Sequence, residues 1–187
     1  MNIFWIKARE YGYAHFKIIL EIVQMLYTAH HALGSALDGA PEGAYRATHA
    51  KHPVCKWVRA SGANYARACE HGARLLGEYY ARYGAKRVHA CEPHLRWLAC
   101  NTPAALRDTC TPAHLSVPPF VGAGASWQPT SWSDLEAAYR NLYRTEKRAI
   151  ALKMGKCPTG VVRAPARWLD EPLEALEPAA GTQHAAL

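Results

Sequence analysis

Apolar side chains recur every three or four residues between positions 14 and 33, and this spacing constrains the fold more than any other feature. The repeat is carried by Phe16, Ile19, Leu20, Val23, Leu26 and Tyr27. A period near 3.6 residues lines such side chains along one face of an amphipathic helix. Gly34 follows as a helix stop, because glycine readily accepts the left-handed backbone found there. The segment is therefore predicted to be a helix with a buried face.

A second, longer helical segment is predicted from Pro53 to Tyr83. Proline suits the first turn of a helix, and Gly84 supplies a stop after Tyr83. One of two internal glycines, Gly62 or Gly72, is expected to mark a bend in this helix.

The middle of the chain continues the helical pattern and interrupts it once. Helices are expected at residues 88–99 and, briefly, from Thr102-Pro103 onward. Residues 111–132 are rich in proline and are predicted to form an extended crossing. At the N-terminus, residues 3–6 are compatible with one short strand.

The last predicted helix begins at a capping box. Ser133 and Glu136 have the spacing at which a hydroxyl and a carboxylate cap each other's backbone amides. The helix is expected to run to about Met154. Its basic side chains form a stripe of Arg140, Arg144, Lys147 and Arg148.

Length and charge bound the organisation of the chain. At 187 residues it is large enough for one domain with a buried core. The net charge is +7, from 22 Lys and Arg residues against 15 Asp and Glu residues, and four of the acids follow Arg167. We expect one compact all-α domain over residues 1–168 and an acidic, loose tail over 169–187. The basic body should attract nucleic acid or another anionic surface, although an inert basic surface is the simpler alternative.

The cysteines and the hydropathy pattern favour a cytosolic protein. Six cysteines are present with no CxxC pair, as expected in a reducing compartment. The N-terminus does not resemble a signal peptide. The longest apolar stretch, at residues 18–26, is interrupted by Glu21 and Gln24 and is too short to span a bilayer. We expect a monomer with no membrane partner.

Residues 48–84 interleave basic, aromatic and amide side chains on predicted helices. This pattern is typical of a protein that grips a polyanion and handles a planar ring. The aromatic residues Trp57, Tyr65 and Tyr79 are also explained as side chains that pack one helix against another.

Common cofactor and metal signatures are absent from the sequence. His49, His52 and Cys55, and likewise His89, Cys91 and His94, are close in sequence but do not have the spacing of a zinc site. No Gly-rich phosphate loop, GxSxG elbow or HExxH motif is present. We predict no metal and no cofactor.

Glu21 is a candidate catalytic residue because it lies inside an otherwise apolar helical segment. Lys17 lies four residues earlier, on the same face. On a solvated face the two would form an ordinary ion pair. In a desolvated cleft the carboxylate would instead become a usable general base or acid.

Several motifs together resemble those of a family of small phage proteins, over roughly residues 1–153. They are Ile19-Leu20-Glu21, Gln24-Met25-Leu26-Tyr27-Thr28-Ala29-His30-His31, Thr48-His49, His52-Pro53, Trp57-Val58-Arg59, Ser61, Asn64-Tyr65, Arg82-Tyr83-Gly84, Ala138-Tyr139-Arg140-Asn141, Tyr143 and Glu146-Lys147. That family is distantly similar to the pyrimidine-dimer DNA glycosylases of the endonuclease V type. Those enzymes are compact all-helical domains that bend duplex DNA, flip a nucleotide and use a helix-borne glutamate beside an amine nucleophile.

The resemblance implies a role for each matching residue. Glu21 takes the position of the glycosylase glutamate, with Lys17 and His52 as further catalytic groups. A DNA-facing cleft would be lined by His30, His52, Arg59, Asn64 and Tyr65. Phosphate contacts would come from Arg140, Arg144 and Lys147, and Asn141 would read or position the flipped base.

Two departures from the glycosylase pattern change the implied chemistry. Asn2 is too large for efficient removal of the initiator methionine, so the amine nucleophile of the glycosylases is not expected. The Asp-x-His element of most relatives is also missing. The leading hypothesis is therefore a phage enzyme of thymine hypermodification that flips a pyrimidine in duplex DNA. It would transfer an amino acid or polyamine onto phosphorylated 5-hydroxymethyluracil. The alternatives are a DNA glycosylase or lyase, and a non-catalytic DNA-binding or inhibitor protein.

Overall fold

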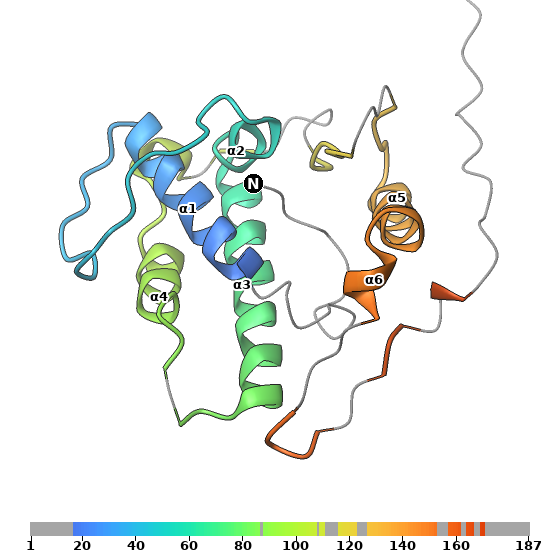
Figure 1. The fold of residues 1–187 in the computed structure, drawn as a ribbon. Helices are drawn as coiled ribbons and strands as arrows, with labels where there is room; N and C mark the ends of the chain where they lie inside the picture. The colour runs from blue at the N-terminus through green and yellow to red at the C-terminus, as the bar shows by residue number, and fades with distance from the viewer. Residues whose placement is uncertain are drawn as a thin grey trace, which may run out of the picture.

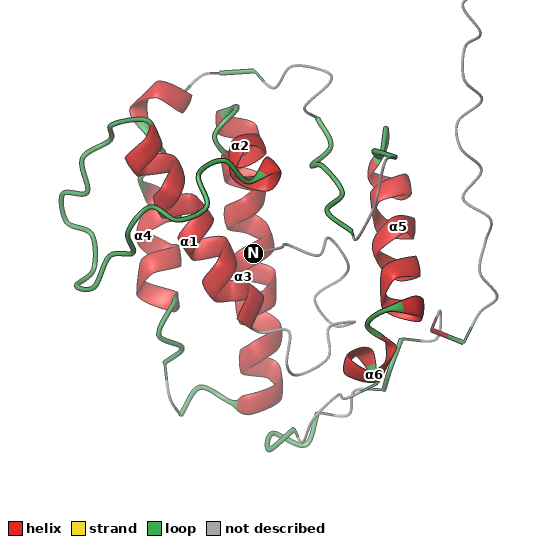
Figure 2. Ribbon diagram, turned by 45° about the horizontal axis from the view of Figure 1, so that its top comes forward, coloured by secondary structure: helices red, strands yellow, loops and turns green. Residues whose placement is uncertain are grey.

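The computed structural model describes residues 17–86, 88–107, 109–110, 116–122, 127–152, 157–161, 164–166 and 169–170. These residues form α1 Lys17–Ala32, α2 Pro53–Val58, α3 Gly62–Tyr83, α4 Glu92–Cys100, a 3-10 turn η3 Ala104–Leu106, α5 Trp132–Thr145 and α6 Arg148–Ala151. Helices and loops make up all of the described chain, with no strand (Figures 1 and 2). The prediction of a compact all-α domain is confirmed, whereas the strand considered at residues 3–6 lies outside the described residues.

Helix α1 is the centre of the bundle. It packs against α2, α3 and α4, so its side chains are buried on more than one side. Gly72 of α3 lies against Ile22 of α1 and Leu95 of α4, and an added Cβ would come within 3.1–3.2 Å of both. Gly72 therefore permits close packing of three helices, and α3 continues through it. Gly34 adopts a φ of 64° just beyond α1, as expected for a helix stop.

The helix predicted from Pro53 to Tyr83 is in fact two helices, α2 and α3. Ser61 takes an extended backbone between them, and its Oγ accepts a hydrogen bond from the amide of Asn64 at 3.1 Å. The Asn64 side chain donates to the carbonyl of Trp57 at 3.0 Å and so caps the end of α2. Because these two side chains satisfy both helix ends, the chain breaks before Gly62 and does not merely bend there.

Helix α4 starts four residues later than expected. The His89 side chain accepts a hydrogen bond from the amide of Cys91, which forms a turn ahead of the helix. Pro93 then lies in the first turn of α4, where a missing N–H costs nothing. The short helix expected after Pro103 is present as η3.

The capping box of α5 lies two residues before the predicted one. Ser131 Oγ accepts from the amide of Asp134 at 3.1 Å, and the Asp134 carboxylate accepts from the amide of Ser131 at 2.9 Å. This start places Leu135 in the core and leaves Glu136 to pair with Arg140. The helix also ends earlier than predicted, at Thr145, before the separate turn of α6.

Helix α5 is joined to the bundle through Trp132 at its N-terminal end. The indole packs edge-on against Trp57 of α2, with ring centroids 6.4 Å apart. The Arg67 guanidinium of α3 lies 4.7 Å from the centroid of the same ring. Trp57, itself only 1% exposed, is therefore a packing residue, as one of the two interpretations of the sequence expected.

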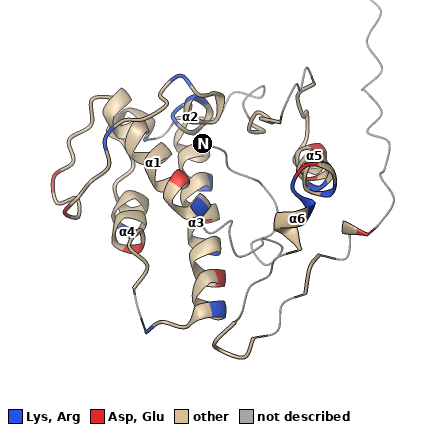
Figure 3. Ribbon diagram, in the orientation of Figure 1, with Lys and Arg blue, Asp and Glu red and all other residues tan. Residues whose placement is uncertain are grey.

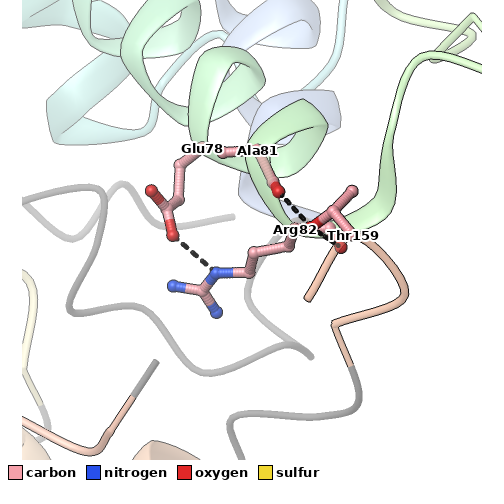
Figure 4. A network of polar contacts seen from close by, with 4 residues as sticks. All are labelled: Glu78, Ala81, Arg82 and Thr159. Carbon is pink, nitrogen blue, oxygen red and sulfur yellow. Dashed lines mark hydrogen bonds and ion pairs between the residues drawn. The ribbon is translucent and has the colours of Figure 1, made fainter. Parts of the chain in front are cut away.

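A buried ion pair marks the C-terminal end of α3. Arg82 is fully buried, and its Nε donates to the Glu78 carboxylate at 2.6 Å (Figure 4). Thr159 Oγ1 bonds the carbonyl of Ala81 at 2.6 Å, so residues 157–161 return to this helix end. A buried guanidinium is tolerable only with such a partner. The Glu78–Arg82 spacing is visible in the sequence, but its burial is not.

The packed part of the chain extends slightly past the predicted domain boundary at residue 168. Leu169 is 3% exposed and belongs to the core, and Asp170 forms an ion pair with Arg148 at 2.6 Å. The rest of the predicted 169–187 tail lies outside the described residues. Among the helices that the structure describes, none has the length and apolar character needed to cross a membrane.

We expect Gly62→Ala to destabilise the fold strongly, because its new Cβ would lie 2.4 Å from the backbone oxygen of Leu106. Gly77→Ala in the same helix is the matched control, since its Cβ would meet no described atom within 4 Å apart from its chain neighbours and the backbone of its own helix. The control should raise the free energy of unfolding by about 0.5–1 kcal/mol. Thermal and urea unfolding of both variants measure the contrast. Equal effects would show that α3 and η3 are not in close contact.

Candidate functional site

The 48–52 loop lies along α1 and is held at both ends. The amide of Thr48 donates to Thr28 Oγ1 at 3.0 Å, and this hydroxyl also faces the carbonyl oxygens of Gln24 and Thr48, at 2.7 and 3.1 Å. At the other end, Arg59 donates to the carbonyl of Ala50 at 2.7 Å. Two side chains from different helices therefore set the path of the loop.

This path brings His52 towards Glu21. Thr28 lies seven residues after Glu21, which is two turns or about 10 Å along α1. The Glu21 carboxylate is close enough to His52 to act electrostatically on its ring. Glu21 and His52 are both half-buried. Two predicted catalytic residues, 31 positions apart in sequence, thus lie within electrostatic range of each other.

His52 is also the N-cap of α2, and this contact determines which nitrogen of the neutral ring carries the proton. Its Nδ1 accepts a hydrogen bond from the amide of Val54 at 3.2 Å, so the neutral ring carries its proton on Nε2. Burial lowers the pKa of His52, the charge of His49 lowers it further, and the charge of Glu21 opposes both. The stability that comes from neutral His52 is therefore present above about pH 6.5 and lost as the pH falls. A neutral His52 can donate from Nε2 to a substrate atom.

Lys17 and Arg59 lie at the edges of this group. Lys17 is the first residue of α1 and is exposed, one helical turn before Glu21. Arg59 is half-buried and is the C-cap of α2. We call Lys17, Glu21, His52 and Arg59 the α1–loop site. Figure 3 shows the basic and acidic positions at the start of α1 on neighbouring turns.

Three residues expected to line a DNA-facing cleft are instead interior. Tyr65 is fully buried, and its hydroxyl donates to the carbonyl of Leu98 at 3.2 Å while accepting from His30 Nε2 at 3.0 Å. His30 is 2% exposed, and burial lowers its pKa, as does the nearby charge of His31. Asn64 is 4% exposed and caps α2. These three side chains hold α1, α2, α3 and α4 together, and their contact with DNA stays a prediction.

The predicted phosphate-contacting residues lie on a separate element. Arg140 and Arg144 are half-buried on α5, and Lys147 is the N-cap of α6. Arg140 donates to Glu136 at 2.5 Å, and Arg148 of the same basic stripe pairs with Asp170. Acidic and basic positions accordingly mix on α5 (Figure 3). The stripe is less uniformly cationic than its sequence indicates.

A pocket of about 180 Å³ beside α5 was not anticipated from the sequence. Asn141 contributes to its wall, together with Phe120 and Trp127 from the proline-rich crossing. The Asn141 Oδ1 is buried and accepts no hydrogen bond from any residue that the structure describes. Asn141 was predicted to read a base. Phe120 and Trp127 were not predicted, because in the sequence they are isolated aromatic residues in a loop.

Neither of the His/Cys clusters forms a metal site in the described chain. No group of three or more His, Cys, Asp or Glu side chains is arranged to hold a metal ion among these residues. Burial raises the pKa of Cys55 to about 11, so this thiol stays protonated at neutral pH. In the other cluster, His94 Nδ1 is hydrogen-bonded to the Tyr27 hydroxyl at 2.9 Å.

Comparisons with protein-family models, with curated proteins and with solved structures gave no match to this chain.

Replacing Glu21 by Gln should lower the pKa of His52 further, because the substitution removes the negative charge that favours the protonated ring. Titration of the imidazole signals by NMR measures this directly. Glu70→Gln is the control, since Glu70 pairs with Arg74 on the surface of α3. An unchanged His52 pKa in the Glu21 variant would show that the two side chains do not interact.

Proposed function

We propose that this protein modifies DNA bases during phage infection. In this proposal it binds duplex DNA, flips out a 5-substituted pyrimidine and transfers an amino acid or other amine onto phosphorylated 5-hydroxymethyluracil. It acts as a monomer in the cytoplasm of the bacterial host. The observation that carries the proposal is the convergence of Glu21 and His52 at the α1–loop site.

The proposed reaction is a displacement at the CH2 group attached to C5 of the base. The amine nitrogen of the co-substrate forms a bond to this carbon, and the carbon–oxygen bond to the phosphate breaks. The phosphate leaves with the electron pair of that bond. Glu21 accepts the proton lost by the amine and so acts as the general base.

Neighbouring residues have supporting roles in this proposal. Neutral His52 donates a hydrogen bond from its Nε2–H to a phosphate oxygen, which stabilises the charge that develops on the leaving group. Lys17 is exposed one turn from Glu21 and supplies a positive charge for the same group. Arg59 holds the 48–52 loop through Ala50 and so positions His52.

DNA binding is assigned to the basic residues of α5 and α6. Arg140, Arg144 and Lys147 would contact phosphates, and the excess of 22 basic over 15 acidic residues would add non-specific attraction. The contacts of Trp132 with α2 and α3 hold the N-terminal end of α5 against the bundle. Arg140 and Arg144 lie towards the opposite, C-terminal end of α5, where phosphates would be bound.

Glu21→Gln should abolish product formation and leave DNA affinity unchanged, because the amide cannot accept the proton. The substrate is a duplex oligonucleotide carrying phosphorylated 5-hydroxymethyluracil, incubated with amino acids and polyamines and analysed by intact mass. Loss of phosphate with gain of an amine mass is the expected result for the wild type, and Glu70→Gln is the control variant.

The same measurement separates the alternative functions. Loss of the base or strand scission would identify a glycosylase or lyase. An unchanged mass with tight, salt-sensitive binding would favour a non-catalytic DNA-binding protein. Full turnover by the Glu21 variant would remove this residue from the mechanism.

Lys147→Ala and Arg140→Ala should each weaken DNA binding without regard to sequence. For each phosphate interaction that a substitution removes, the slope of log affinity against log salt should fall in magnitude by about 0.9. Arg96→Ala removes the same charge from α4, where the side chain is 78% exposed, and serves as the control. Fluorescence anisotropy at several salt concentrations provides the slopes. If all three variants change the salt slope equally, the proposal that DNA binds the basic residues of α5 and α6 is wrong.

A further inference from the structure

A pocket of about 540 Å³ lies where α1 and α4 both end. Leu33 and Gly34, directly after α1, form part of its wall, and Trp97 and Asn101, at the end of α4, form another part. The volume is within the range of small-molecule sites, roughly 300–1,000 Å³. Leu33 follows Glu21 by twelve residues, or about 18 Å along the helix axis. The pocket is therefore separate from the α1–loop site.

Two opposite charges in the wall of this pocket have no ionic partner. Asp38 belongs to the loop after α1, and Arg107 follows the 3-10 turn η3. Both side chains are exposed, and within the described chain neither forms an ion pair with the other or with a third residue. A carboxylate and a guanidinium are consequently both available to a ligand.

The end of α4 adds a neutral acceptor and a neutral donor. Asn101 Nδ2 donates to the carbonyl of Trp97 at 2.8 Å, which leaves Asn101 Oδ1 as an acceptor without a partner among the described residues. Unlike Asn141 Oδ1, this oxygen keeps accessible surface, so a ligand can reach it. The indole Nε1 of Trp97 faces the neighbouring turn, where an added Cβ on Gly39 would lie 3.9 Å away. Its N–H is therefore close to Asp38 and senses what enters the pocket.

The charges of the pocket narrow the class of ligand. The C-terminal ends of α1 and α4 carry negative partial charge, which favours a cation near them. A simple anion is disfavoured by these helix ends and by Asp38, whereas a simple cation is disfavoured by Arg107. A ligand with one ammonium and one carboxylate group satisfies both side chains. Leu33 and the buried Pro103 supply an apolar part of the wall.

We infer that this pocket binds a small zwitterion of the α-amino-acid type with an apolar side chain. The ammonium group of the ligand pairs with Asp38 and donates to Asn101 Oδ1, and its carboxylate pairs with Arg107. Its side chain packs on Leu33 and Pro103. The site is distinct from the place of the proposed transfer reaction, and the inference does not rest on that reaction.

The test is an NMR titration of the ¹⁵N-labelled protein with L-leucine, read at the indole N–H signal of Trp97. Leucine should shift this signal to saturation. N-acetyl-leucine has no ammonium group and leucinamide has no carboxylate, so each should bind about tenfold more weakly through the loss of one charged hydrogen-bonded pair. No saturable shift with leucine, or equal affinity for the two derivatives and leucine, would overturn the inference.

Asp38→Asn and Arg107→Gln should each weaken leucine binding about tenfold, because each removes one of the two charges that the ligand requires. Glu42→Gln and Arg46→Gln are the matched controls. They remove the same charges from exposed positions outside the pocket and should bind leucine as the wild type does. If the pocket variants and their controls have equal affinity, the proposed contacts are wrong.

Glu21→Gln separates this pocket from the proposed reaction. The variant should bind leucine as tightly as the wild type, because Glu21 does not line the pocket. Loss of leucine binding in this variant would place the ligand at the α1–loop site and would overturn the inference. Failure of leucine to bind would leave the proposed base modification in place, and absence of base modification would leave the zwitterion pocket in place.

Discussion

The hydrogen bonds between Thr28 and Thr48 are the interaction on which the α1–loop site depends. They attach the 48–52 loop to the central helix of the bundle, two turns from Glu21. His52 ends the same loop within electrostatic range of Glu21, and the capping bond to Val54 sets the tautomer of its ring. The Thr28 side chain therefore fixes, through the main chain of Thr48, the start of the loop that ends at His52.

The sequence predicts the helices of this protein better than it predicts their ends. The stop at Gly34 and the stop at Gly84 were predictable, because both require a positive φ that glycine accepts at little cost. The break between α2 and α3 was not, since it depends on Ser61 and Asn64 capping two helix ends at once. At α5, two overlapping patterns of serine and acid were available. The packing of Trp132 and Leu135 selects the earlier one.

The candidate site could be predicted in part, and the reason lies in burial. Glu21 was identifiable as a carboxylate within an apolar helix, and His52 as the residue before a helix-starting proline. The polar residues Asn64, Tyr65 and His30 looked alike in sequence, yet the fold uses them inside. Periodicity cannot distinguish a polar side chain that faces solvent from one whose hydrogen bonds are completed by another helix.

The interior contains polar groups of two kinds, and the difference between them is informative. Tyr65 uses its hydroxyl as both donor and acceptor, and Arg82 is buried against Glu78, so each offsets the cost of its own desolvation. Asn141 does not: within the described chain, its buried oxygen contributes no hydrogen bond to the fold. A buried acceptor without a hydrogen bond lowers the stability of the fold, so the Asn141 oxygen costs free energy that Tyr65 and Arg82 recover through their partners.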